Sequence, residues 1–112
     1  MDTTRQQKIS RLLQKDLGEI IQRLDKDILQ NRMVTVTVVR VSPDLSLARV
    51  YLSIFPSAGA EEFLKHLRHF TKPIRNQLGQ RVKHQLRIVP EIALFIDDSL
   101  DYVDKIDELL KK

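Results

Sequence analysis

Residues 63 to 90 read FLKHLRHFTKPIRNQLGQRVKHQLRIVP, two helical patterns followed by an apolar one. Lys72-Pro73 separates the helical patterns. Proline lacks an amide hydrogen, and its ring disfavours the helical conformation of the preceding residue. Proline also suits the start of a new helix. We therefore expect two short helices that meet at Lys72-Pro73, the second ending near His84.

The charge of this stretch is one-sided. It has no acidic residue, although it contains all three histidines of the chain, His66, His69 and His84. Its lysines and arginines are Lys65, Arg68, Lys72, Arg75, Arg81, Lys83 and Arg87. Acidic residues predominate from residue 91 to the end. Such asymmetry indicates an oriented electrostatic surface and favours a polyanion partner such as nucleic acid. Solvated helix faces whose charges happen to segregate are the alternative.

The composition argues against several other classes of protein. The 112 residues are expected to form a single domain, residues 1–112, that needs no disulfide or metal to fold. Cysteine is absent, so thiolate metal sites and thiol nucleophiles are excluded. The polar N-terminus lacks a signal-peptide core, and no apolar run reaches the ~20 residues that span a bilayer. We expect a soluble, cytoplasmic protein with no membrane partner.

The segment before the basic stretch predicts a helix and a hairpin. Apolar residues recur at three- and four-residue steps over about Thr4 to Leu29, which is typical of an amphipathic helix. Asp2, Thr3 and Thr4 are candidate N-caps, and Gln6 or Gln7 could complete a capping box. Gly18 lies in the middle of this helix, where a close approach to the sheet would explain the missing side chain.

Residues 33–42 and 47–55 predict two antiparallel strands joined by a turn at Ser42-Pro43-Asp44. The first strand changes phase at Val38, so a β-bulge there would keep four valines on one face. Those valines are Val34, Val36, Val39 and Val41. On the second strand, Tyr51 and Phe55 point away from the core. They are expected to pack under the last helix, and stacking on RNA bases is the alternative.

The end of the chain predicts a third strand over residues 86–96, bent or at a sheet edge because of Pro90, and a short helix over residues 100–110. Alternate residues of the strand, from Leu86 and Ile88 to Ile96, are expected to face inward. The resulting order is α-β-β-α-(kink)-α-β plus a short C-terminal helix. We expect an α+β fold with a three-stranded sheet and helices packed on it.

Three blocks of sequence carry a resemblance to a known family. They are RQQKISRLLQKDLGEII (5–21), VRVSPDLSLARVYLSIF (39–55), and PIRNQLGQRV with LRIVPEIALFIDDSL (73–82 and 86–100). With the order of elements, they resemble the type II KH-like architecture and the bacterial ribosome-binding factor A family. The resemblance implies a non-catalytic factor that binds the free 30S subunit through 16S rRNA. It also implies support for late 30S maturation, for processing of the 16S 5′ end and for growth in the cold.

The resemblance also implies where the RNA binds. One group of candidate residues is on the N-terminal helix: Arg5, Lys8 and Arg11. The other is in the broken helix pair: Lys65, Arg68, Lys72, Arg75, Arg81, Lys83 and Arg87. We expect a monomer with no cofactor, no metal and no small-molecule substrate.

The sequence departs from the KH pattern in one important place. A KH domain that reads single-stranded RNA needs a G-x-x-G loop, and the three glycines, Gly18, Gly59 and Gly79, cannot form one. The family's Ala-x-Gly kink is replaced by Phe70-Thr71-Lys72. We therefore expect recognition of the RNA backbone and shape, with a phosphate-binding site at the start of the second short helix.

The sequence gives only weak support for a metal site or for catalysis. His66 and His69 lie one helical turn apart but lack the closed ligand set that zinc requires, so solvated or phosphate-contacting histidines are favoured. Carboxylates before and within the last helix are favoured by its dipole, and Ser99 suits its N-cap better than a nucleophile's role. The alternative function is a protein-docking adaptor that uses the acidic C-terminal helix.

Overall fold

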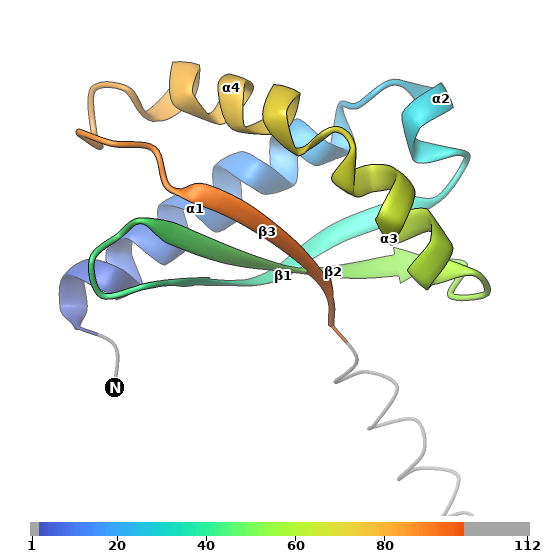
Figure 1. Ribbon diagram of the computed structural model, residues 1–112, viewed down its shortest axis with the longest axis horizontal. Coiled ribbons are helices and arrows are strands. Elements are labelled where there is room, and N and C mark those ends of the chain that lie inside the picture. The colour runs from blue at the N-terminus through green and yellow to red at the C-terminus, as the bar shows by residue number, and fades with distance from the viewer. Residues whose placement is uncertain (1–2, 98–112) are drawn as a thin grey trace, which may run out of the picture.

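The computed structural model describes residues 3 to 97 (Figure 1). Its elements are α1 (Thr4–Gln22), α2 (Lys26–Leu29), β1 (Met33–Val41), β2 (Leu47–Phe55), α3 (Ala60–Arg68), α4 (Thr71–Val82) and β3 (Glu91–Ile96). The predicted α+β order is confirmed, with the short helix α2 added to it. The predicted helix at residues 100–110 lies outside the described residues.

The sheet has the strand order β1-β2-β3. β1 and β2 pair antiparallel, whereas β2 and β3 pair parallel. A parallel pair requires a long crossover connection, which α3 and α4 provide. α1 and α4 pack together on one side of the sheet, and α3 lies beside β3 (Figure 1). The core between them is mainly aliphatic, and its fully buried residues include Leu13, Leu17, Val50, Leu52 and Leu78.

The β-bulge predicted in the first strand is present. The register between β1 and β2 shifts between Val36 and Val38, so Thr37 is the extra residue. The four predicted valines are all buried: Val34, Val36, Val39 and Val41. One inserted residue therefore corrects a phase that would otherwise turn half of the strand away from the core.

The N-terminal helix is shorter than predicted. Its start is confirmed, because the Thr3 side chain accepts from the Gln6 amide while the Gln6 side chain accepts from the Thr3 amide. It ends at Gln22, and a separate helix, α2, follows. Leu24 and Ile28 still pack against the core. The helical spacing of apolar residues therefore continues across the break between α1 and α2, and this spacing alone does not reveal the break.

The explanation predicted for Gly18 does not hold. A Cβ atom built at Gly18 meets nothing within 4 Å. The predicted close approach of helix and sheet at this position is therefore wrong, and the structure gives no steric reason for the glycine.

The break in the basic stretch lies three residues before the predicted place. α3 ends at Arg68, His69 and Phe70 form the turn, and α4 starts at Thr71. Pro73 is the third residue of α4, where a first-turn amide has no partner within the helix, so its missing hydrogen costs little. Two short helices are confirmed, but the break at Lys72-Pro73 is wrong because Lys72 is helical.

The third strand starts later than predicted, at Glu91 instead of Leu86. Glu91 pairs with Leu47, the first residue of β2, so the preceding residues have no strand beside which to extend. Pro90 also has no amide hydrogen to donate to a ladder. Ile88, predicted to face inward, is 69% exposed. Residues 86–90 therefore form an irregular connection between α4 and β3.

Candidate nucleic-acid interface

Three exposed basic residues in the first half of α1 form one stripe. Arg5, Lys8 and Arg11 are all exposed and lie at three-residue steps, which places them on neighbouring turns of one side of the helix. None of the three makes a hydrogen bond or ion pair within residues 3 to 97. The first turn of α1 contains no acidic residue that would balance the charge. This stripe is therefore available to an anion.

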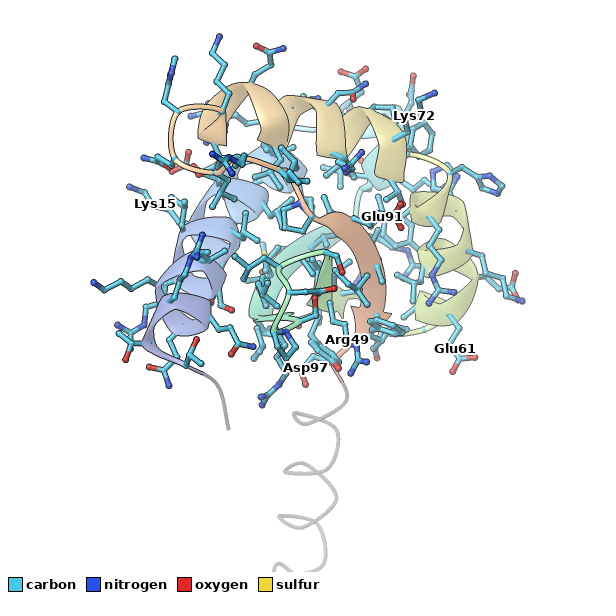
Figure 2. The ribbon with its side chains drawn as sticks, turned by 60° about the vertical axis from the view of Figure 1, so that its left-hand side comes forward. Lys15, Arg49, Glu61, Lys72, Glu91 and Asp97 are labelled. Carbon is cyan, nitrogen blue, oxygen red and sulfur yellow. The ribbon has the colours of Figure 1, made fainter. Side chains whose placement is uncertain are left out.

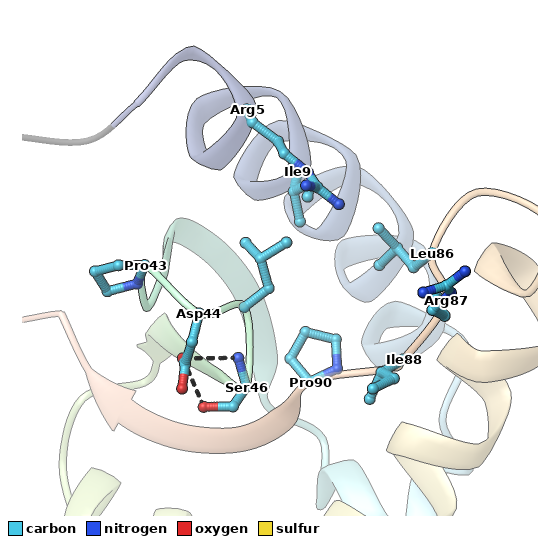
Figure 3. Close-up of a pocket in the computed structure, with 10 residues that line it drawn as sticks. Arg5, Ile9, Pro43, Asp44, Ser46, Leu86, Arg87, Ile88 and Pro90 are labelled. Carbon is cyan, nitrogen blue, oxygen red and sulfur yellow. Dashed lines mark hydrogen bonds between the residues drawn. The ribbon is translucent and has the colours of Figure 1, made fainter.

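A cavity of about 330 Å³ joins this stripe to the C-terminal part of the basic stretch (Figure 3). Arg5 and Arg87 both line the cavity, although they come from opposite ends of the sequence. The remaining lining residues are Ile9, Pro43, Asp44, Leu45, Ser46, Leu86, Ile88 and Pro90. The wall is mainly apolar, and two guanidinium groups belong to its lining. That combination suits a ligand with an anionic group and a less polar body.

Asp44 is the acidic residue of this cavity, and its carboxylate is held inside its own turn. One carboxylate oxygen, Oδ1, accepts from the Ser42 hydroxyl at 2.7 Å and from the Ser46 hydroxyl at 2.7 Å. It also accepts from the Ser46 amide at 3.1 Å. These hydrogen bonds lower the pKa of Asp44 from 3.8 to about 2. The carboxylate therefore stays ionised and fixes the shape of the β1–β2 turn.

Arg81 is bound within the protein. Its Nη1 atom donates to Glu19 and, at 3.3 Å, to Asp16, both on α1. The hydrogen bond from Arg81 lowers the pKa of Glu19, against an opposing effect of desolvation, and the same bond raises the pKa of Arg81. The stretch without acidic residues is therefore partly neutralised by α1 in three dimensions. Arg81 ties α4 to α1.

Arg75 and Arg68 also make hydrogen bonds within the fold. Arg75 is half-buried and donates to the carbonyls of Val89 at 2.7 Å and Pro90 at 3.0 Å. Arg68 donates from two nitrogens to the carbonyl of Leu94, at 2.8 and 3.2 Å. Both guanidinium groups satisfy carbonyls at or beside β3, which is an edge strand of the sheet formed by residues 3 to 97. These arginines hold the path of the chain.

The other predicted residues of the helix pair are exposed. Lys72 is near the start of α4, Lys83 is its C-cap, and Arg87 follows in the connection to β3. Lys65 on α3 forms an ion pair with Glu62 at 3.7 Å, and both side chains are largely exposed, so this pair stabilises little. Lys83 and Arg87 lie beyond the C-terminal end of α4, whereas Lys72 and Lys65 lie towards its start. The predicted surface thus has two separate parts.

The predicted phosphate-binding site at the start of the second helix shifts to Thr71, where that helix begins. α4 begins at Thr71, and its N-cap Phe70 has no side chain that caps the helix. Pro73 removes one of the first-turn amides. Thr71 donates its hydroxyl to the carbonyl of Arg68 at 2.8 Å, which closes the turn between the two helices. Phosphate binding at the start of α4 stays a prediction.

His66 has a structural role. Its Nε2 atom donates to the carbonyl of Ile28 at 3.0 Å, and its ring lies between Phe63 and Phe70, with ring centroids 5.9 and 5.2 Å away. This contact ties α3 to α2. Among residues 3 to 97, no group of three or more histidines and carboxylates is placed to bind a metal ion. Within the same residues, no helix combines the length and apolar character that crossing a membrane requires.

Two basic residues on the sheet could not be singled out from the sequence. Arg40 and Arg49 are exposed cross-strand neighbours on the side of the sheet opposite α1. Their outward positions followed from strand alternation, but each is a single arginine in an apolar strand and gave no charge run. On the same side, Tyr51 stacks on Phe95 with centroids 5.6 Å apart, while Phe55 is 70% exposed. The alternative adaptor function rests on residues 98–112, outside the described part.

Comparison with known proteins gives a consistent result. The family model described as ribosome-binding factor A matches residues 5–110. Ribosome-binding factor A of Flavobacterium johnsoniae is 49% identical over 111 residues, which cover 98% of this chain and 85% of the relative. That of Cytophaga hutchinsonii is 40% identical over 112 residues, which cover 100% of this chain and 84% of the relative.

Solved structures agree with this result. The crystal structure of ribosome-binding factor A from Thermus thermophilus matches with a TM-score of 0.69 and 27% identity, over 81% of this chain and 94% of the other. A homology model of the Thermus thermophilus factor, fitted into the cryo-EM map of its complex with 30S, matches with a TM-score of 0.63 and 29% identity. This second match covers 80% of this chain and 91% of the other.

Proposed function

The chain belongs to the ribosome-binding factor A family, and we propose on that basis that it binds the free 30S subunit through 16S rRNA. The Thermus thermophilus relative, whose model was fitted into the map of a 30S complex, supports this assignment. The exposed cations of α1 and of the connection after α4 support it independently, because RNA binding depends largely on phosphate neutralisation.

The meeting of Arg5 and Arg87 at one cavity is the observation that carries the proposed interface (Figure 3). These two arginines, with Lys8 and Arg11 on α1 and Lys83 after α4, contact rRNA phosphates. Lys65 and Lys72 form a second, smaller contact near the start of α4. Arg68, Arg75 and Arg81 position the surface by bonding within the protein and contribute less to RNA binding than their charge suggests.

The proposed role is assembly and not catalysis. Backbone and shape recognition by a small basic surface suits a factor that docks on a folded RNA–protein particle and leaves again. We propose that the protein acts as a cytoplasmic monomer, without a cofactor, in late 30S maturation. Support of 16S 5′-end processing and of growth in the cold is part of the same proposal.

Co-sedimentation with free 30S subunits at several salt concentrations tests the interface. The double variant Arg5→Gln/Arg87→Gln is expected to weaken binding. It should also flatten the plot of log affinity against log salt by about 0.7 to 0.9 for each phosphate that is no longer neutralised. The control is Arg23→Gln/Lys26→Gln, which removes the same charge from exposed positions at the C-cap of α1 and the start of α2.

The control variant is expected to bind like the wild type. Equal weakening by both doubles would mean that net charge alone matters and would remove the assigned interface. Unchanged binding by Arg5→Gln/Arg87→Gln would exclude the cavity as an rRNA contact. If the wild-type protein is mixed with free 30S subunits and stays at the top of the gradient instead of sedimenting with them, the proposed function itself is contradicted.

A further inference from the structure

One side of the sheet is uncovered within the described residues. We call it the outer face, and define it by the residues whose side chains point away from α1 and α4: Met33, Thr35, Thr37, Val38, Arg40, Leu47, Arg49, Tyr51, Ser53, Phe55, Glu91, Ala93 and Phe95. Met33 and Phe55 are cross-strand neighbours, and they are 69% and 70% exposed. Val38 and Phe95, on either side of Tyr51, are 36% and 37% exposed. An apolar patch of this kind marks a surface that packs against something.

The outer face also contains a pair of adjacent arginines, although Glu91 and Asp97 lie on the same side of the sheet. Arg40 and Arg49 occupy directly opposed positions on β1 and β2, and both are exposed. Like charges in such a pair destabilise a sheet. Neither arginine makes a hydrogen bond or ion pair within residues 3 to 97. An acidic occupant would turn this unfavourable pair into a favourable contact.

The chain itself runs onto the outer face where the described part ends. Asp97 continues the β3 pairing, since its amide donates to the carbonyl of Leu52 at 2.8 Å. By strand alternation its side chain lies on the same side as Phe95. Its carboxylate accepts from the hydroxyl of Thr37, so it reaches across β2 to β1. Figure 2 shows Arg49 and Asp97 on the same side of the sheet, away from Lys72 on α4.

The sequence that follows matches this surface in both properties. Residues 98–112 read DSLDYVDKIDELLKK. Apolar residues recur at three- and four-residue steps at Leu100, Val103, Ile106 and Leu110, which is one stripe of a helix. The acidic residues beside the stripe are Asp98, Asp101, Asp104, Asp107 and Glu108. The segment thus offers an apolar face for the exposed aromatic and aliphatic side chains, and carboxylates for the two arginines.

We propose that residues 98–112 dock on the outer face of the same molecule, with the stripe against Met33, Val38 and Phe55 and the carboxylates near Arg40 and Arg49. Asp97 is attached to both the sheet and the segment, so docking is intramolecular. A short tether gives an effective concentration in the millimolar range, so even a weak contact is well populated. The docked segment shields the outer-face arginines from RNA and leaves the α1 and α4 side as the basic surface that faces the ribosome.

A spin label placed near the C-terminus tests this docking in the intact chain. The protein has no cysteine, so Lys111→Cys supplies the one thiol for a nitroxide. In the NMR spectrum, we expect paramagnetic broadening of the methyl signals of Met33 and Val38, with the methyls of Leu12 on α1 unaffected. No broadening of Met33 and Val38, or equal broadening of Leu12, would overturn the proposal.

Matched variants separate specific docking from loose proximity. Val103→Asn/Ile106→Asn removes the apolar stripe without adding charge, and should abolish the broadening. Lys105→Asn places the same side chain at a position outside the stripe and should leave the broadening in place. Persistence of the broadening in the first variant would contradict docking by the stripe.

A mixed sample identifies the molecule that receives the segment. Isotope-labelled protein without the nitroxide is combined with unlabelled protein that has it. Intramolecular docking leaves the labelled protein unbroadened. Broadening in this mixture as strong as in the singly prepared sample would show that the segment docks on a second copy and would overturn the proposal.

Discussion

Arg81 on α4 donates a hydrogen bond to the carboxylate of Glu19 on α1, residues separated by 62 positions in the sequence. Asp16, one turn earlier on α1, accepts from the same nitrogen. This cluster is the point at which the basic stretch meets acidic residues from elsewhere in the fold. It divides the candidate RNA-binding arginines into those that organise the protein and those that remain available to a ligand.

Arg81→Gln and Arg87→Gln test this division with the same chemical change. Arg81→Gln should lower the free energy of unfolding, because Glu19 and Asp16 lose their partner, and should leave the salt dependence of 30S binding unchanged. Arg87→Gln should do the reverse: little loss of stability, and a flatter salt dependence by about 0.7 to 0.9. Urea denaturation and co-sedimentation measure the two effects. A flattened slope for Arg81→Gln would show that its ion pairs open to bind rRNA.

Gly18→Ala should stabilise the protein. The position is in the middle of α1, and an added Cβ atom meets nothing within 4 Å. Alanine favours a helix over glycine by about 1 kcal/mol, so the midpoint of urea denaturation should rise. The contrasting variant is Gly59→Ala. Gly59 has a φ of +72° and its Cβ would lie 3.3 Å from Arg32, so this change should destabilise by about 1 to 2 kcal/mol. Loss of stability in Gly18→Ala would show a constraint that the packing does not reveal.

Deletion of Thr37 should be tolerated. It removes the extra residue of the bulge, and the regular alternation that results keeps Val36 and Val39 on the core face. The cost should be about 1 to 3 kcal/mol, because the hydrogen bonds to Asp97 and from Gln14 disappear. Deletion of Thr35 should instead prevent folding, because it turns Val34 outward. Circular dichroism and urea denaturation distinguish the two results. Similar behaviour of both deletions would contradict the assigned bulge.

Arg75→Lys should loosen the connection between α4 and β3. The guanidinium donates to both Val89 and Pro90, and a lysine ammonium cannot reproduce this two-pronged geometry. Hydrogen bonds from a charged donor are worth about 1.5 to 3 kcal/mol, so a loss of about 1 to 2 kcal/mol is expected. Hydrogen exchange should accelerate at Glu91 and Ile92 but not at Val50. Unchanged exchange at Glu91 would show that the connection holds its path without Arg75.

Asp44 should make stability depend on pH in the acid range. Its pKa is lower in the folded protein, about 2 against 3.8, so the folded state binds the proton less readily than the unfolded chain. The stabilisation is therefore complete above about pH 4 and is lost as the pH falls through about 2. Carbon-13 NMR of the Asp44 carboxyl should give a midpoint near 2. Ser46→Ala should raise that midpoint, while Ser57→Ala, a matched change in an exposed loop, should not. An unshifted midpoint in Ser46→Ala would show that the serine bonds are not the cause.

Local sequence patterns predicted much of this fold, because the spacing of apolar residues shows which face of each helix or strand is buried. Alternation placed Val50 and Leu52 inside, and a phase change revealed the bulge before Val38. The same patterns misplaced boundaries where the chain turns without losing its apolar spacing, as between α1 and α2. Pro73 was a poor marker of the helix break, because a proline is accommodated anywhere in the first turn. β3 begins only where β2 provides a partner, and a strand's own sequence does not contain that information.

The sequence by itself determined the family, the order of helices and strands, and the charge that suggests RNA, because these depend on local composition and spacing. Only the tertiary structure decided which cations are available. Packing of α4 on α1 placed Arg81 against Glu19, and the path of residues 86–90 turned Arg75 inward to carbonyl oxygens. The same path brought Arg87 to Arg5 around one cavity. Charge is a property of residues, but its availability depends on neighbours that are distant in sequence and close in space.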